Sequence, residues 1–154
     1  MVRQSEGQPE PALAASCSKA QNPEQTGGGQ SERTMRLPQA IEPAFFDQVF
    51  RRDLAAWRVA VVEVCAVHGV ECDAVSAFVD GSNLVAAVND RWIVKIFPTF
   101  HSHQWESERR VLAHLRNEAL PLKVPMLIAE GTRDDGWLYV VMGKLPGLPL
   151  STCW

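Results

Sequence analysis

The residue with the most evident chemical potential is Lys95, in the middle of the segment DRWIVKIF, residues 90–97. Apolar residues fill most of this segment and predict a β-strand, in which period-two alternation places Lys95 on one face with Ile93 and Phe97. An ammonium group in such a strand is unfavourable unless a negative group meets it. Two interpretations are open: Lys95 has an anionic partner, or it lies at a sheet edge and extends its amine to water.

A candidate partner, Glu108, lies in the segment SHQWESERRVLAHLRNE, residues 102–118, which has helical periodicity. Glu108 follows Trp105 by three residues and lies on the apolar stripe that should face the sheet, whereas Glu106 lies off that stripe. We therefore expect Glu108 to pair with Lys95, which would remove most of the cost of burying either charge. The alternatives are a purely structural ion pair and a Glu108 that leans outward.

A third feature is the turn DGSN, residues 80–83, which separates two predicted strands. Gly81 would let the backbone approach a ligand closely, while Ser82 and Asn83 add a hydroxyl and an amide that can hydrogen-bond phosphate oxygens. Because Asp-Gly is also common in ordinary hairpins, the turn alone indicates only a hairpin. A glycine-bearing turn, a strand lysine and a helix carboxylate together are the parts with which protein kinases hold the phosphates of ATP.

The elements that must position these residues occupy residues 71–150. Five short runs rich in β-forming residues predict strands, with the helix of residues 102–118 between the third and the fourth: AVSAFV, LVAAV, RWIVKIF, MLIAEG and WLYVVM. Short connections favour antiparallel pairing, so we predict an α+β fold, a five-stranded antiparallel sheet with one packed helix. Upstream, apolar residues at helical spacing predict one amphipathic helix over residues 42–70, and the polar composition of residues 1–41 predicts a disordered leader.

Residues 74–150 resemble a known family. The segments GSNLVAAVNDRWIVKIF, ESERRVLAHL, VPMLIAEG and WLYVVMGKLPGLPL follow one another in the order and spacing of the N-terminal lobe of the aminoglycoside phosphotransferase family, the small-molecule relatives of protein kinases. The resemblance implies a kinase-like N-terminal lobe that binds ATP together with Mg²⁺. The full-length family transfers the γ-phosphate of ATP to a hydroxyl of a small molecule such as an aminoglycoside.

The resemblance also implies a set of cofactor-binding residues: Gly81, Ser82, Asn83, Lys95, Glu108, Met142, Gly143 and Leu145. Lys95 would contact the α- and β-phosphates, and Glu108 would orient it beneath the phosphate-covering turn. Met142 would line the back of the adenine pocket, and the Gly143 carbonyl and the Leu145 amide would hydrogen-bond the adenine edge. Without the resemblance, this last stretch is equally consistent with an ordinary strand and turn.

One part of the family pattern finds no counterpart before Trp154, namely the His-x-Asp loop, its later Asn and the further Asp that orient the acceptor and bind magnesium. Residues 151–154 would then begin a missing C-terminal lobe, and we assign no catalytic residue. We expect the chain alone to be inactive, as a truncated product or as half of a split enzyme with a separate catalytic lobe. Its uncovered face would favour homo-association. The alternative is a non-catalytic protein-binding module or an inactive fragment.

Composition argues against several other classes of function. A formal net charge of −3 with mixed signs predicts neither nucleic-acid nor membrane binding, and no apolar run is long enough for a membrane span. Four scattered cysteines without a Cys-x-x-Cys pattern indicate reduced thiols, so we expect a cytoplasmic protein. His101 and His103 lack further nearby ligands, so we expect them in a solvent-facing loop and predict no metal site there.

Overall fold

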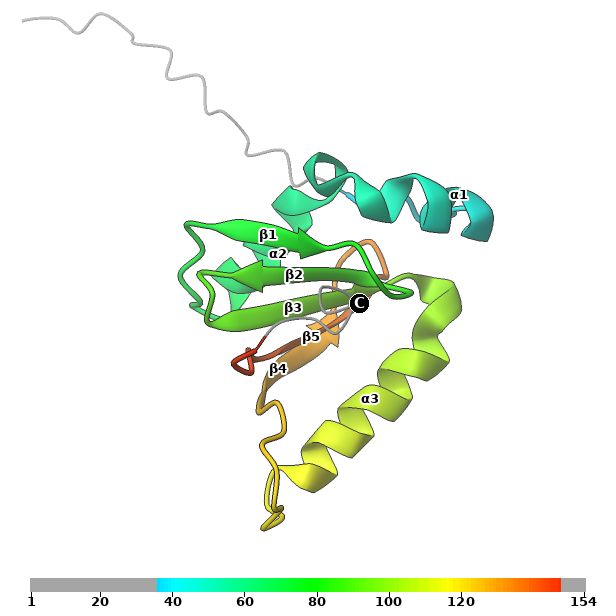
Figure 1. Cartoon of the computed structure of the whole chain (residues 1–154). Helices are drawn as coiled ribbons and strands as arrows, with labels where there is room; N and C mark the ends of the chain where they lie inside the picture. Colours follow the sequence, from blue (N-terminus) through cyan, green and yellow to red (C-terminus); the bar gives the residue numbers. More distant parts are fainter. Residues whose placement is uncertain (1–35, 148–154) are drawn as a thin grey trace, which may run out of the picture. The chain divides into compact units, whose positions relative to one another are not determined.

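The computed structural model describes residues 36–147, and Figure 1 shows the order of their elements. Residues 1–35 of the predicted leader and the predicted start of a C-terminal lobe at residues 151–154 lie outside the described part. Within the described part no helix has the length and apolar character needed to cross a membrane. The elements are α1 (Pro43–Gln48), η1 (Phe50–Arg52), η2 (Leu54–Ala56), α2 (Arg58–Val67), β1 (Val75–Phe78), β2 (Leu84–Val88), β3 (Trp92–Phe97), η3 (Thr99–His101), α3 (Ser102–Leu115), β4 (Leu127–Thr132) and β5 (Leu138–Gly143).

Strand β3 is the central strand of a five-stranded sheet with the order β1-β2-β3-β5-β4, in which every neighbouring pair is antiparallel. Lys95 is paired with Val85 of β2 on one side and with Val140 of β5 on the other. Lys95 therefore does not lie at a sheet edge. The predicted α+β fold with a five-stranded antiparallel sheet is confirmed.

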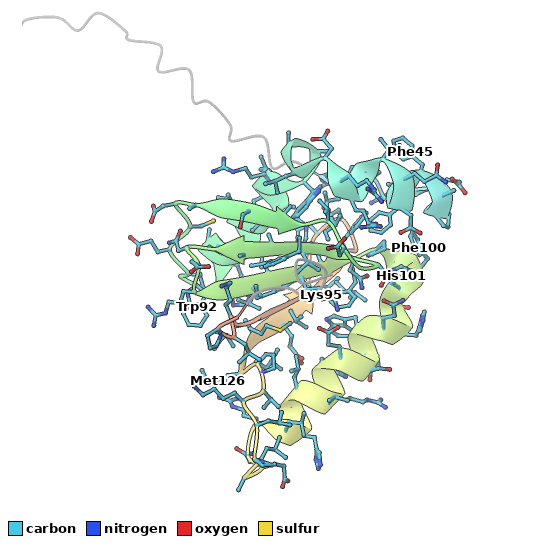
Figure 2. All side chains as sticks on the ribbon, in the orientation of Figure 1. Phe45, Trp92, Lys95, Phe100, His101 and Met126 are labelled. Atoms are coloured by element: carbon cyan, nitrogen blue, oxygen red, sulfur yellow. The ribbon has the colours of Figure 1, made fainter. Side chains whose placement is uncertain are left out.

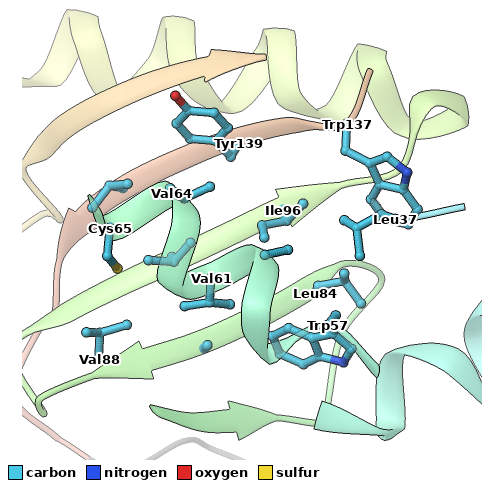
Figure 3. Close-up of a cluster of buried hydrophobic side chains, with 14 of the residues drawn as sticks. Leu37, Trp57, Val61, Val64, Cys65, Leu84, Val88, Ile96, Trp137 and Tyr139 are labelled. Carbon is cyan, nitrogen blue, oxygen red and sulfur yellow. The ribbon is translucent and has the colours of Figure 1, made fainter. Parts of the chain in front are cut away.

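The sheet is covered on both faces. On one face α2 packs against a cluster of buried side chains that includes Leu84 and Ile96 (Figure 3). On the other face a second cluster, which includes Phe97 and Leu112, holds α3 against β3 and β5. Each fully buried side chain of this size contributes about 1.5–3 kcal/mol relative to exposure. Alternation along β3 places Lys95 on the α3 face, as predicted.

The segment predicted as one helix over residues 42–70 is divided into four pieces, so that prediction is corrected. Val49, with φ −123° and ψ −64°, leaves helical geometry after α1. The Asp53 side chain accepts a hydrogen bond from the N–H of Ala55 and thereby begins η2. A short polar side chain that bonds to nearby backbone in this way favours a new start over a continuous helix. The apolar spacing persists in α2, whose inner face is buried.

Residues 36–41, the predicted end of the leader, are described and pack on the core. Leu37 is 2% exposed and belongs to the cluster on the α2 face. Its N–H donates to Asp135 Oδ2 at 2.9 Å, and the indole N–H of Trp137 donates to the Pro38 carbonyl at 3.0 Å. Residues 36–41 therefore belong to the packed lobe, and the predicted boundary of the leader at residue 41 is corrected.

Asp135 is the polar centre of this region and is 3% exposed. Its carboxylate accepts hydrogen bonds from the N–H of Leu37 and from Arg133, whose Nη2 lies 2.9 Å from Oδ2. Arg133 also donates to the Ala60 carbonyl and the Glu63 carboxylate of α2. Burial alone would raise the pKa of Asp135, but the hydrogen bonds from Arg133 and Leu37 and the attraction of the guanidinium outweigh burial and lower the pKa. Asp135 and Arg133 together thus join the N-terminal stretch, α2 and the β4–β5 hairpin.

Gly131 in β4 should tolerate no side chain. A Cβ at this position would lie 2.5 Å from Tyr139 Oη. Tyr139 cannot easily move, because it is buried and its hydroxyl lies 3.0 Å from His68 Nε2. Gly131→Ala should therefore lower the free energy of unfolding by about 1–3 kcal/mol, as overpacking does, in urea denaturation. Gly143→Ala is the matched control, since a Cβ there meets its nearest atom at 3.9 Å; equal losses in both variants would contradict the clash.

Candidate functional site

Lys95 of β3, labelled in Figure 2, donates a hydrogen bond to Glu108 of α3, so the predicted pairing is confirmed. Lys95 Nζ lies 2.5 Å from Glu108 Oε2, and the two side chains are 22% and 27% exposed. Lys95 Nζ also lies 5.0 Å from the centroid of the Phe97 ring. An ammonium group has three donors, so one carboxylate partner leaves donors for a further anion. Because the pair is only partly buried, an anionic ligand can reach it.

Helix α3 is fixed across the sheet by contacts that set the position of Glu108. Trp105 belongs to the cluster on this face, and its indole N–H donates to the Tyr139 carbonyl at 3.0 Å. Leu112, one turn after Glu108, is 7% exposed. Glu106 lies off this stripe and pairs with arginines of the same helix, as its spacing predicts. The carboxylate that meets Lys95 is thus set by the apolar stripe of α3.

The predicted phosphate-covering turn joins β1 to β2 at the edge of the sheet where α3 begins (Figure 1). Gly81 has φ +114°, which an L side chain rarely adopts and glycine adopts freely. Gly81 and Ser82 are exposed, so their backbone is open to a ligand. Asn83 requires a correction: it is 3% exposed, and its amide is bonded to Gln104 and His101. Its side chain is therefore occupied within the protein and is not directed at a phosphate.

His101 also belongs to this region, which corrects the prediction of a solvent-facing loop. Its Nδ1 lies 3.1 Å from Asn83 Oδ1, and its ring centroid lies 4.6 Å from that of Phe100, which precedes it in η3 (Figure 2). Burial lowers the pKa of His101, although the Asp47 carboxylate acts in the opposite direction. The folded protein therefore favours the neutral imidazole, which donates through one nitrogen. His103 is exposed, as expected of both histidines.

The three predicted hinge residues line one pocket on the sheet: Met142, Gly143 and Leu145. The pocket has a volume of about 300 Å³ and is also lined by Phe78 of β1 and Ile93 of β3. Ile93 precedes Lys95 by two residues on the same face of β3, a separation of about 7 Å along a strand. An apolar pocket and an accessible ammonium group therefore lie next to each other on the α3 side of the sheet.

A larger pocket, of about 440 Å³, lies on the α2 face and is lined by Tyr139 and by several charged residues. Tyr139 precedes Val140 in β5, and Val140 pairs with Lys95, so alternation puts this pocket on the opposite side of the sheet from Lys95. Arg133, which lines it, is engaged by Glu63 and Asp135. We assign this pocket no part in the site.

The sheet, the crossing helix and the lysine–glutamate pair between them define a kinase-like N-terminal lobe. The model of the phosphotransferase enzyme family (APH) matches residues 76–153. This match covers half of the chain, and the chain belongs to that family. It includes every residue that the sequence nominated for the site.

Comparison with solved structures found, among others, the GDP complexes of wild-type aminoglycoside 2′-phosphotransferase-IIIa and of a point mutant of that enzyme. Each match has 20% sequence identity and a TM-score of 0.47, and covers 58% of this chain and 30% of that chain. The present chain thus spans less than a third of the length of these structures. No curated protein matched the sequence.

Proposed function

We propose that this chain is the nucleotide-binding lobe of an aminoglycoside-phosphotransferase-like kinase and that its nucleotide is ATP. The observation that carries the proposal is the partly exposed Lys95–Glu108 pair, at 2.5 Å, beside a glycine turn and an apolar pocket on the same side of the sheet. The complete family member would transfer the γ-phosphate of ATP to a hydroxyl of a small molecule such as an aminoglycoside. Residues 36–147 would contribute nucleotide binding to that reaction.

The phosphates would be held by the lysine and covered by the turn. Lys95 would donate its remaining N–H groups to oxygens of the α- and β-phosphates, as charge-assisted hydrogen bonds. Glu108 would keep the amine in position, because a flexible lysine side chain otherwise samples many rotamers. The exposed backbone at Gly81 and Ser82 would lie over the phosphates and offer N–H groups to them.

Adenine would occupy the pocket at the hinge. Ile93 and Met142 line this pocket and would contact the faces of the base. The Gly143 carbonyl and the Leu145 N–H would hydrogen-bond the edge of the base. These are backbone groups, so recognition there depends on the path of the chain and not on the side chains.

Phosphoryl transfer is assigned to other residues. It needs Mg²⁺ and a group that orients the acceptor hydroxyl. Residues 36–147 contain no group of three or more His, Cys, Asp or Glu side chains placed to hold a metal ion. A second lobe, on this chain or on a separate polypeptide, would supply both functions.

Calorimetric titration of the chain with ATP tests the proposal. We expect saturable binding of ATP and weaker binding of AMP, because AMP lacks the β-phosphate that Lys95 would contact. GTP, titrated in parallel, separates recognition of the base from recognition of the phosphates. A chain that is folded by circular dichroism and binds none of the three nucleotides would overturn the proposal in favour of a non-catalytic module.

A further inference from the structure

Three side chains, Asn83, His101 and Gln104, connect the turn to the start of α3. Asn83 Nδ2 donates to Gln104 Oε1 at 3.0 Å and to Ser82 Oγ at 3.2 Å. His101 Nδ1 donates to Asn83 Oδ1 at 3.1 Å, and the Ser82 hydroxyl donates to Gln104 Oε1 at 3.2 Å. In this arrangement each donor meets an acceptor, so the hydrogen bonds are mutually consistent.

The turn depends on this network because it has little packing of its own. Gly81 and Ser82 are exposed, and no atom lies within 4 Å of the point where a Cβ of Gly81 would be. The Val79 carbonyl accepts a hydrogen bond from Arg51, which anchors the beginning of the turn. Asn83, 3% exposed, anchors its end. A buried amide of this kind must be satisfied by partners, and two of its three partners, His101 and Gln104, belong to the chain around the start of α3.

The same helix also carries the partner of Lys95. Gln104 and Glu108 are four residues apart in α3, so their side chains lie on one face of the helix, one turn from each other. Gln104 holds the turn and Glu108 holds the lysine. A displacement of α3 would therefore move both parts of the phosphate site together.

We propose that Asn83, His101 and Gln104 are positioning residues that fix the phosphate-covering turn to α3. They act through the backbone of the turn and do not contact the nucleotide themselves. The inference rests on the proposed function, because covering the phosphates is part of that function. Since the network holds the turn and not the adenine pocket, its loss should weaken binding of ATP and leave binding of adenosine unchanged.

Gln104→Met tests the inference, because it removes the acceptor and keeps the length of the side chain and the preference for helix. The NMR order parameters of the Gly81 and Ser82 amides should fall from about 0.85, typical of rigid backbone, to below about 0.6. ATP should bind about five- to tenfold more weakly, the usual effect of losing one or two neutral hydrogen bonds, and adenosine affinity should not change. His101→Phe, which keeps an aromatic ring beside Phe100, should act in the same direction.

His114→Gln is the control, since His114 is an exposed histidine in the last turn of α3, away from the network, and its substitution should leave the order parameters and both affinities unchanged. Unchanged order parameters in a Gln104→Met chain that binds ATP like wild type would overturn the inference alone. A wild-type chain that binds no nucleotide would overturn the proposed function and the positioning role with it. The two failures are therefore distinguishable.

Discussion

A chain carrying Lys95→Ala should bind ATP about ten- to one-hundredfold more weakly than wild type. The substitution removes the charge-assisted hydrogen bonds that Lys95 would make to the phosphates, and bonds of this kind contribute about 1.5–3 kcal/mol. Adenosine should bind with unchanged affinity, because Ile93 and Met142 line the hinge pocket and Lys95 does not. Titration calorimetry with ATP and adenosine measures both effects.

Lys123→Ala provides the control for this experiment. It makes the same substitution at an exposed lysine in the connection before β4, so it changes the net charge equally and should leave ATP affinity unaltered. Lys95→Ala leaves the Glu108 carboxylate without its partner, which could destabilise the fold. The double variant Lys95→Met/Glu108→Gln removes both charges and therefore leaves no unpaired charge between β3 and α3. A folded double variant with wild-type affinity for ATP would show that the phosphates do not bind at Lys95.

The largest effect on stability should follow Asp135→Ala, which should lower the free energy of unfolding by about 3–5 kcal/mol, the range observed when one member of a buried ion pair is removed. Arg133 would lose one of its carboxylate partners, and the buried N–H groups of Leu37 and Trp137 would lose their acceptor. Urea denaturation measures the difference. Asp134→Ala, at the exposed neighbouring position, should cost far less.

The effect of Asp135→Ala should also depend on pH. The pKa of Asp135 is lowered below its ordinary value of 3.8, so the folded state favours the carboxylate. Its contribution to stability is therefore fully present above about pH 3.8 and is lost as the pH falls further, through the lowered pKa. The difference between wild type and Asp135→Ala should shrink in that acidic range. A difference that is constant with pH would show that the charge of Asp135 is not what stabilises the fold.

The Lys95–Glu108 pair could be predicted from the sequence because two local periodicities determine it. Alternation in β3 fixes the face of Lys95, and helical spacing in α3 fixes the face of Glu108. The side of the sheet on which Ile93 lies could be predicted in the same way, since Ile93 shares the face of Lys95 in β3. Each of these inferences requires only a few neighbouring residues.

The network around the turn could not be predicted in the same way. Asn83 is separated by 21 residues from Gln104 and by 18 from His101, so their contact depends on where the hairpin meets the helix. One signal was available, because Gln104 lies four residues before Glu108 and therefore on the same face of the helix. The burial of Leu37 was even harder to predict from the sequence, since its polar partner Asp135 is 98 residues away.

The pairing of Lys95 with Val85 and Val140 in neighbouring strands also bears on misfolding. A slip of β3 by one residue would reverse its two faces and carry the ammonium group to the apolar side, beside Leu84 and α2. There it would lie among apolar side chains and away from Glu108, so such a misaligned sheet would be disfavoured by on the order of several kcal/mol. Lys95 thereby favours one alignment of a sheet whose inner strands, β2, β3 and β5, consist otherwise mainly of apolar residues and would accept another.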